Sequence, residues 1–502
     1  MHLRRDISQS EFVIYVLIWV TCVFFSIYCF ATSANKYFQN YEDHYSDFTE
    51  GWSLISRRKD NGDPEWRLMK LLLKTVPLWI IFSCFVSEVL RQFKLFQLLQ
   101  VWQILISTTF IITELGILPL GLIVFQPLLF ALVLFFTRSR FIIWVTNILT
   151  LLLLFMCRHI GFSEEFLAEN KLNQESAHVI VTTIYWMNLK CVSYCIDFID
   201  SKQEHISLTF ASYCLHMPNL VLGPFVSYKN FEGCYKTDEC LWDRFLKLIL
   251  NIFRFLFWFV FTDFFLHFIY VNAVVYHYEW IKTLGSWSLY GYGYTMGQFF
   301  HIKYVIMYGL STTFQKFENI EVPSLPICIG RVHLYSDMWR YFDAGLYNFL
   351  QSYMYIPLMK NFFKYRLIPS LICFTFIYVW HGTDESILVW SVLNYVGIVI
   401  EQVSKWIDDE YLKKSTLEIM VGPKWRRRIT CAAASPLLAM SCVSNFYFFS
   451  GNKVGYIFVS RLLNYDILWS NLILLVILYT MCQISTEIKS KEKRSSQIHK
   501  KN

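Results

Sequence analysis

Long apolar stretches recur along almost the whole of this chain of 502 residues. A stretch of about 20 apolar residues is enough to cross the hydrocarbon core of a bilayer, which is about 30 Å thick. Hydrophobic residues make up 55% of the sequence and charged residues only 17%, where about 25% is usual for a soluble domain. Backbone in lipid must satisfy its own hydrogen bonds, so these stretches predict membrane-spanning helices. We therefore expect an all-α polytopic membrane protein.

The first apolar run, residues 12–31, follows a short basic segment. It is longer than the apolar core of a signal peptide and has no small-residue cleavage site, so we expect an uncleaved span with a cytosolic amino terminus. Two further runs, 177–198 and 206–226, are interrupted by polar residues and are expected to kink or to re-enter the membrane. The other expected spans are 71–90, 96–113, 116–136, 141–157, 245–272, 296–314, 387–403, 429–446 and 466–484.

The formal net charge of +7 lies largely in short segments that flank the apolar runs. This distribution is typical of the positive-inside bias of membrane proteins, and it gives no support to nucleic-acid binding. The last residues, 485–502, are basic and polar. They predict a cytosolic tail that follows a polytopic membrane domain of residues 1–484.

The 14 cysteines are scattered, and most of them lie inside apolar runs. No two are spaced as CxxC, so neither a zinc ribbon nor a thioredoxin-type site is predicted. Buried free thiols are the expected state. Cys234 and Cys240 flank a polar loop and can form a disulfide if that loop is lumenal.

Ionisable residues inside apolar runs are costly in lipid, and they usually face a bundle interior, a cavity or a partner. Lys190 and Asp197 lie two helical turns apart in the run YWMNLKCVSYCIDF, so both project from one face. We interpret them as a structural ion pair. In the stretch SYCLHMPNLVLGPFVSYKNF, two prolines and a glycine rule out one regular helix, and the freed backbone groups at such a bend can line a tunnel.

Residues 328–357 are predicted to form an amphipathic helix, because Met338, Phe342 and Phe349 belong to an apolar set that recurs at helical spacing. Asp343 falls beside this apolar stripe, within one turn of Trp339. From the pattern alone, a solvated acid on an interfacial helix is a sufficient explanation of Asp343.

His381 lies in the run FIYVWHGTDESILVW, at the point where apolar residues give way to polar ones. The apolar run from Pro369 to Trp380 covers about 18 Å at about 1.5 Å per residue, which is short of a core about 30 Å thick. If the helix starts at one interface, the histidine ends partway into the membrane. If the helix starts earlier, the histidine reaches the far surface. An interfacial helix end and an intramembrane catalytic group therefore both stay open.

Three motifs follow one another along the chain: YCLHMPNLVLGPFVSYKNF, MWRYFDAGLYNFL and VWHG. Together they resemble the membrane-bound O-acyltransferase (MBOAT) superfamily and, within it, the hedgehog acyltransferases. The first is similar to the proline and GP element of that family, the second to its tryptophan–arginine helix and the third to its histidine motif. The resemblance implies an MBOAT-like bundle of about ten transmembrane helices, with re-entrant segments around a central tunnel.

The same resemblance implies a function. A palmitoyl group would pass from palmitoyl-coenzyme A to the amino-terminal cysteine amine of a secreted hedgehog-type protein, the activity of a protein-cysteine N-palmitoyltransferase. Coenzyme A would enter the tunnel from the cytosol, and the protein would enter from the lumen of the endoplasmic reticulum. The implied partners are palmitoyl-coenzyme A, that amino-terminal cysteine and the lipid bilayer. The implied location is the membrane of the endoplasmic reticulum, with the Golgi as a second one.

Several residues take their roles from the resemblance. Many members of the superfamily carry asparagine where this chain has Asp343, and an acid there is similar to the hedgehog-acylating branch. The segment SNFYFFSGNKVG resembles a late segment of that branch, in which Asn445 would face the reaction chamber. Cys328 matches a cysteine that ligates haem there, which implies a structural haem b held by its thiolate. A buried structural thiol is the alternative for Cys328.

Acyl transfer from a thioester needs an amine that has lost its proton. Neutral imidazole can accept that proton near pH 7, so His381 is the candidate general base. Asp343, the second candidate catalytic residue, would orient the imidazole or the amine, or relay the proton. Trp339 and Arg340 are the candidates for gating the acyl passage and for binding the phosphates of coenzyme A. An arginine that reaches for lipid headgroups is the competing explanation of Arg340.

Two other classes of function stay open. One is an MBOAT-type O-acyltransferase whose acceptor is a lipid or a serine of a secreted protein; Asp343 in place of asparagine argues against it. The other is a non-enzymatic transporter or channel, in which intramembrane His, Asp and Lys side chains carry ions. Turnover of a thioester by the purified protein separates this second class from the enzymes.

Overall fold

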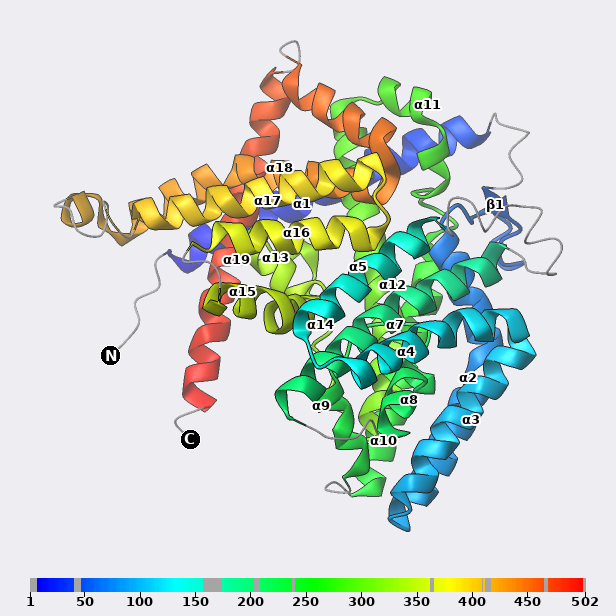
Figure 1. Cartoon of the computed structure of the whole chain (residues 1–502). Helices are drawn as coiled ribbons and strands as arrows, with labels where there is room; N and C mark the ends of the chain where they lie inside the picture. Colours follow the sequence, from blue (N-terminus) through cyan, green and yellow to red (C-terminus); the bar gives the residue numbers. More distant parts are fainter. Residues whose placement is uncertain are drawn as a thin grey trace.

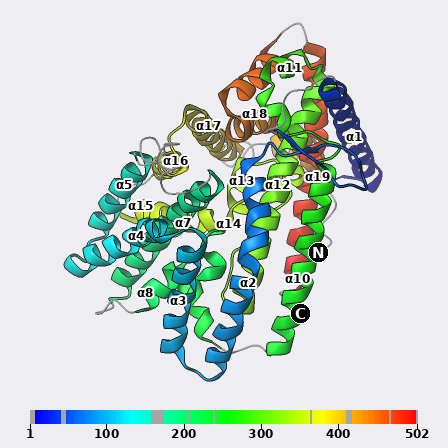
Figure 2. The same cartoon turned by 90° about the vertical axis from the view of Figure 1, so that its right-hand side faces the viewer.

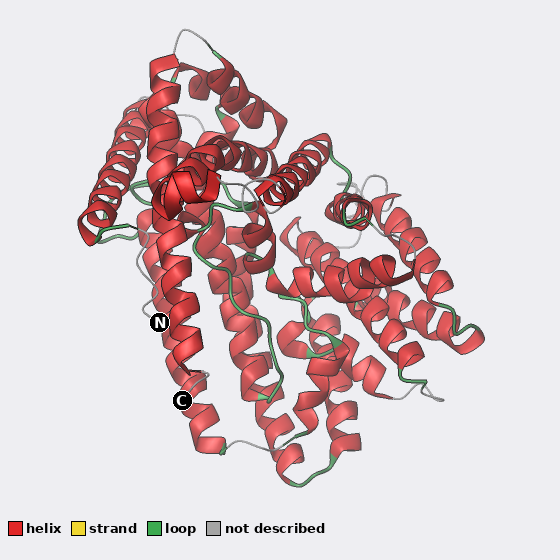
Figure 3. Ribbon diagram, turned by 90° about the vertical axis from the view of Figure 1, so that its left-hand side faces the viewer, coloured by secondary structure: helices red, strands yellow, loops and turns green. Residues whose placement is uncertain are grey.

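The computed structural model describes residues 7–39, 47–156, 174–202, 208–236, 240–361, 365–408, 410, 417–464 and 468–499. These residues are almost entirely helical (Figure 3). Within these ranges, nine helices are long and apolar enough to cross a membrane, which confirms the predicted all-α polytopic fold. They are α1 (Gln9–Gln39), α2 (Pro64–Gln92), α3 (Phe96–Glu114), α4 (Ile117–Phe136), α7 (Gln174–Asp200), α10 (Leu241–Phe265), α17 (Glu385–Ile407), α18 (Leu417–Leu463) and α19 (Leu468–His499).

The remaining elements are shorter or more polar. Two short apolar helices are α5 (Arg140–Met156) and α16 (Leu367–His381), and α12 (Ser286–Phe317) is long but more polar. Strands β1 (Phe48–Thr49) and β2 (Lys59–Asp60) form a small antiparallel ladder. The other helical turns are α8 (Leu208–Cys214), η2 (Met217–Asn219), α9 (Tyr228–Phe231), η3 (Glu232–Tyr235), η4 (Ala273–Tyr276), α11 (Tyr278–Thr283), η5 (Ile329–Arg331), α13 (Tyr335–Tyr341), α14 (Ala344–Phe349), the π-helical η6 (Leu350–Tyr355) and α15 (Ile356–Asn361).

The helices are arranged around α7 and α12. Helix α7 contacts α2, α4, α5 and α8, and α12 contacts α1, α10 and α18. Helices α17 and α18 lie side by side across the upper part of the molecule in Figure 1, and α19 runs past them toward the C-terminus. Helix α1 lies at the outer edge in Figure 2 and exposes large apolar side chains such as Leu17 and Phe24. In a membrane those side chains face lipid.

Two predicted segments differ from the structure in kind. Residues 177–198, expected to kink or re-enter, form the regular span α7, because its polar side chains Asn188 and Ser193 are buried against neighbouring helices. Residues 206–226 are broken as expected, into α8, η2 and an irregular stretch. The predicted boundary between residues 484 and 485 falls inside α19, which continues as a helix to His499. The cytosolic position of residues 485–502 stays a prediction.

The prediction of one amphipathic helix over residues 328–357 is wrong. The chain forms η5, α13, α14 and η6 in succession, and Asp343 stands at the junction of α13 and α14. Its carboxylate accepts a hydrogen bond from the backbone N–H of Leu346 at 2.8 Å, which caps α14 and competes with continuation of α13. A side chain at Gly345 would place its Cβ 2.6 Å from the carbonyl oxygen of Phe225, so only glycine lets α14 lie against that segment.

The predicted ion pair between Lys190 and Asp197 is also wrong. The ammonium of Lys190 donates to the carbonyl oxygens of Asn219 at 2.6 Å and Cys214 at 3.3 Å. Asp197 accepts a hydrogen bond from Tyr353 at 2.8 Å and lies 3.6 Å from Lys229. The end of α8 and the turn η2 present carbonyl groups that have no helical partner, and these attract the buried ammonium more closely than an acid on its own helix does.

The described cysteines are free thiols, as predicted, and Cys157 lies outside the described residues. Cys234 is buried and Cys240 is exposed, and no disulfide joins them.

Lys190 and Asp197 should contribute to stability independently. Lys190→Met removes both hydrogen bonds to buried carbonyls, and we expect it to lower the free energy of unfolding by about 1–3 kcal/mol. Its effect and that of Asp197→Asn should add within about 0.5 kcal/mol, because the two side chains do not meet. Denaturant unfolding of both single variants and the double variant in detergent measures this. A coupling well above that margin would mean that the two charges do pair.

Candidate active site

A single cavity of about 620 Å³ brings most of the predicted site together. Cavities of about 300–1,000 Å³ are typical of small-molecule sites. Four of the predicted residues line it: Trp339, Asp343, His381 and Asn445. One part of its wall, from α1 and α19, is apolar and includes Cys22, Leu474 and Ile477. Another part, from α2 and the start of α14, carries the acids Glu65 and Asp343.

His381 is the last residue of α16 and lies on the cavity wall. Gly382 follows it with φ 115°, a left-handed conformation that ends the helix and that glycine adopts without strain. The imidazole packs edge-on against three aromatic rings, Trp380 at 4.8 Å, Phe448 at 5.2 Å and Trp390 at 5.5 Å between centroids. Within the described part of the chain it makes no hydrogen bond, so its nitrogens are available to a ligand. The histidine is thus a helix end that faces inward.

Asp343 is held at a fixed place on the same cavity. Besides the bond from Leu346, it accepts a hydrogen bond from the hydroxyl of Tyr308 at 2.7 Å. Burial raises the pKa of this carboxyl above its ordinary value, and the two hydrogen bonds oppose that shift. Among the described residues, no hydrogen bond joins Asp343 to His381.

Glu65 is a cavity residue that the sequence analysis missed. It lies in the first turn of α2, its carboxylate is 2.6 Å from the ammonium of Lys303, and it accepts a hydrogen bond from Tyr304 at 3.3 Å. Its charge acts on His381 across the cavity. In the sequence, DPEW is typical of a helix start, where an acid stabilises the first turn, so this acid had an ordinary structural explanation.

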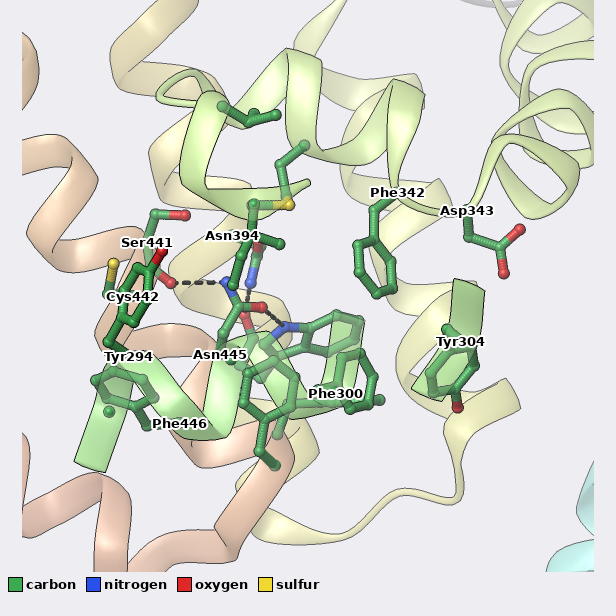
Figure 4. Close-up of a pocket in the computed structure, with 18 of the residues that line it drawn as sticks. Tyr294, Phe300, Tyr304, Phe342, Asp343, Asn394, Ser441, Cys442, Asn445 and Phe446 are labelled. Carbon is green, nitrogen blue, oxygen red and sulfur yellow. Dashed lines mark hydrogen bonds between the residues drawn. The ribbon is translucent and has the colours of Figure 1, made fainter. Parts of the chain in front are cut away.

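Two tryptophans of the cavity wall are each fixed by an asparagine. The indole N–H of Trp339 donates to Asn394 Oδ1 at 3.1 Å, and that of Trp390 donates to Asn445 Oδ1 at 3.2 Å. Figure 4 shows Asn394 and Asn445 on one side of the pocket and Asp343 with Tyr304 on the other, with Phe342 between them. Asn445 lines the chamber as predicted, but its amide oxygen is already engaged by Trp390, whose ring touches His381.

Arg340 and Cys328 do not line the cavity. Arg340 is exposed beside it, with its guanidinium 5.8 Å from the ring of Tyr347, a lining residue. Cys328 is exposed at the start of η5, and its sulfur is 3.9 Å from Gln298 Oε1. In the described ranges no group of three or more His, Cys, Asp or Glu side chains gathers as a metal site. A haem held by Cys328 would be expected to be buried among aromatic side chains, but the Cys328 thiol is exposed. The geometry therefore gives the predicted haem no support.

The cavity is largely apolar, and its lining includes His178, His381, Glu65 and Asp343. Comparison with known proteins shows the family of the chain. A model of the membrane-bound O-acyltransferase family matches residues 128–444. The chain belongs to that family.

Three individual proteins of known name are similar to this chain. The protein-cysteine N-palmitoyltransferase Rasp of Drosophila melanogaster is 30% identical over 285 residues, which is 55% of this chain and 56% of that protein. The protein-cysteine N-palmitoyltransferase HHAT of Mus musculus is 26% identical over 272 residues, 53% of this chain and 54% of that protein. The membrane-bound O-acyltransferase GUP1 of Candida tropicalis is 21% identical over 440 residues, 78% and 73% of the two chains. The chain thus spans about half the length of the first two curated relatives it matches.

Asn445 should act through Trp390. Asn445→Ala and Trp390→Phe each break the hydrogen bond between them, and we expect each to lower acyl-transfer turnover about three- to tenfold, the equivalent of one hydrogen bond. The double variant should lose little more than either single one, because both changes remove the same contact. Turnover of the purified variants measures this. Losses that multiply would show that Asn445 contacts the substrate itself.

Proposed function

We propose that the protein transfers palmitate from palmitoyl-coenzyme A to the amino-terminal cysteine amine of a secreted hedgehog-type protein. The observation that supports this proposal is the cavity, which is lined by His381, by an apolar wall from α1 and α19, and by the acids Asp343 and Glu65. An acyl chain fits the apolar part, and an ammonium group fits the acidic one. The two relatives Rasp and HHAT are named as protein-cysteine N-palmitoyltransferases, and this supports the same assignment.

In this proposal His381 takes the proton of the amine. Its nitrogens are unengaged among the described residues, and a neutral imidazole accepts a proton near pH 7. The amine nitrogen then attacks the thioester carbonyl, a carbon–nitrogen bond forms and the carbon–sulfur bond breaks. The ammonium loses two protons in this reaction: one is released to solvent before the attack, and the one that His381 takes passes from the imidazole to the departing thiolate of coenzyme A. The products are an amide and the free thiol.

Asp343 and Glu65 attract and orient the incoming ammonium before its proton is lost. A carboxylate in a low-dielectric chamber favours a cation there more than it would in water, and because Lys303 lies 2.6 Å from the Glu65 carboxylate and offsets its charge, Asp343 supplies most of this attraction. Tyr308 and Leu346 fix Asp343, so the acid keeps its position while the amine moves in. Asp343 thus acts on the amine and not on the imidazole, which it does not touch.

Trp339 and Arg340 serve the donor. Trp339 stands in the wall between α13 and α17 and is tied to Asn394, a position from which it can gate the acyl passage. The adjacent Arg340 is exposed beside the chamber, where a guanidinium can bind the phosphates of coenzyme A. The endoplasmic reticulum membrane, with coenzyme A on the cytosolic side and the protein acceptor on the lumenal side, is part of this proposal.

The second candidate function is transfer to an oxygen acceptor, a lipid or a serine of a secreted protein. The observation that favours it is the match to GUP1, which is named as a membrane-bound O-acyltransferase. This match covers more of the chain than the match to Rasp or to HHAT does.

Mass spectrometry of the reaction products decides between these functions. Purified protein, palmitoyl-coenzyme A and a peptide with amino-terminal cysteine should give an amide, and the same peptide with its amine acetylated should give no stable product. His381→Ala should lower turnover about 10²–10⁴-fold, the range of general-base catalysis. Asp343→Asn should lower it about tenfold or more while Asn keeps the cap of α14.

Asp384→Asn is the matched control, because Asp384 lies three residues after His381 but does not line the cavity. It should turn over like the unmodified protein. Stable acylation of a hydroxyl on the acetylated peptide would replace the proposed acceptor with the oxygen one. Near-normal turnover of His381→Ala, in folded protein, would remove His381 from the mechanism.

A haem b on Cys328 remains a separate prediction. When bound, the haem would be held by the thiolate of Cys328, the residue before η5, and its role would be structural. If the prediction is correct, protein purified after growth with added haem absorbs in the Soret region, and Cys328→Ala shifts or removes that band. A colourless preparation, or a band that Cys328→Ala leaves unchanged, contradicts it.

A further inference from the structure

The carboxyl-terminal part of α19 is packed against protein, although its sequence is polar. Ser485 and Glu487 are almost fully buried, and the helix continues through Lys489 and Glu492. Figure 1 shows α19 running past α13 toward the C-terminus. A polar helix that only extended into water would not bury these side chains, so their contacts need an explanation.

The contacts of Ser485, Lys489 and Glu492 converge on one segment, residues 329–343, which we call the active-site segment, whereas Glu487 pairs with Arg427 of α18 at 2.9 Å. His333 Nδ1 and Ser485 Oγ are 2.8 Å apart, and the Ser485 hydroxyl donates to the carbonyl oxygen of Arg331 at 2.6 Å. Two ion pairs lie further along α19, Lys489 with Asp337 and Glu492 with Arg331. Together they connect successive turns of α19 to η5, to α13 and to the turn between them.

The hydrogen bond at His333 has a defined direction. Since Ser485 has one hydroxyl proton and gives it to Arg331, Nδ1 of His333 must be the donor. Burial lowers the pKa of His333 to about 4, the charge of Lys489 lowers it too, and the charges of Asp337 and Glu401 oppose the shift. The imidazole is therefore neutral at physiological pH. It makes a fixed contact and not a titrating one.

The opposite face of the active-site segment forms the cavity wall. Five of its residues line the chamber beyond η5: Val332, Met338, Trp339, Phe342 and Asp343. Asp337 and Trp339 are two residues apart on a helix, so they project from nearly opposite faces. A displacement of α13 on the α19 side therefore moves Trp339 and Asp343 in the chamber.

Helix α17 holds the segment from another direction. The backbone N–H of Ser336 donates to Glu401 at 3.0 Å, and a Cβ on Gly397 would lie 2.4 Å from the ring of Tyr335. Helix α17 also follows His381 after a short turn, so it fixes the segment relative to the histidine. The active-site segment is thus clamped between α17 and α19.

We propose that residues Ser485–Glu492 of α19 are a positioning element that holds Trp339 and Asp343 in register with His381 for acyl transfer. That acyl transfer depends on this element rests on the proposed function. That the element holds residues 329–343 in place does not. The element makes no contact with the cavity itself, because none of its residues lines the chamber.

Charge reversal tests the element. Lys489→Asp and Asp337→Lys each place like charges together, and each should lower kcat about tenfold, since a small displacement of a reacting group has an effect of that size or larger. KM for palmitoyl-coenzyme A should rise as well, because Trp339 and Arg340, which serve the donor, move with the segment. The double variant restores the pair with its charges exchanged, and kcat should return to near its original value.

Two further pairs complete the design. Arg331 and Glu492 are more exposed, at 36% and 54%, so the second swap, Arg331→Glu with Glu492→Arg, is better tolerated by the fold and should behave in the same way. The control is the swap of Arg140 and Asp200, 45% and 37% exposed, which pair between α5 and α7, neither of which contains a residue of the active-site segment or of the positioning element. It should leave kcat unchanged.

Hydrogen exchange of residues 329–343 gives a readout that needs no activity. Exchange there should be faster in each single variant and normal in the double one, while α17 stays unchanged. Normal kcat in folded single variants, or an exchanged pair that stays as impaired as the single ones, would overturn the positioning role. If the unmodified protein transfers no palmitate but exchange responds as stated, the proposed function fails, and the element still holds residues 329–343 in place. If exchange does not respond, that holding role itself is contradicted.

Discussion

In the hydrocarbon core of a membrane, a polar group has to meet a partner within the protein, because no water is there to replace it. This constraint arranges much of the interior. The ammonium of Lys190 donates to carbonyl groups at the end of α8 and in η2, and Asn394 and Asn445 each accept from the N–H of a tryptophan. The imidazole of His381 lines the cavity and makes no hydrogen bond among the described residues.

The sequence predicted the parts of the structure that depend on local pattern. Long apolar runs produced the spans, since length and hydropathy alone decide whether a helix can cross a bilayer. The short run before His381 correctly indicated a helix that ends at the histidine, and Gly382 supplies the left-handed residue that ends it. His381 ends α16 and lines the cavity, while its depth in the membrane and its catalytic role stay predictions.

The predictions that failed depended on contacts between distant residues. The spacing of Lys190 and Asp197 places both side chains on one face of α7, but they do not pair. The fold instead brings carbonyl groups from another segment within hydrogen-bond distance of the lysine. Glu65 looks like an ordinary first-turn acid until α2 is placed beside the cavity. Residues 485–499 continue α19, whose Lys489 pairs with Asp337 of α13, while the cytosolic position of residues 485–502 stays a prediction. No local pattern encodes such pairings.

The central claim is that one chamber holds the acyl chain in its apolar part and its thioester beside His381. A palmitoyl-coenzyme A analogue with a photoreactive group at the end of the acyl chain measures this directly. After irradiation and digestion, label should appear on the apolar wall formed by α1 and α19, around Cys22, Leu474 and Ile477, and excess palmitoyl-coenzyme A should suppress it. Saturable label on α3 or α5 instead, with none on that wall, would contradict the account.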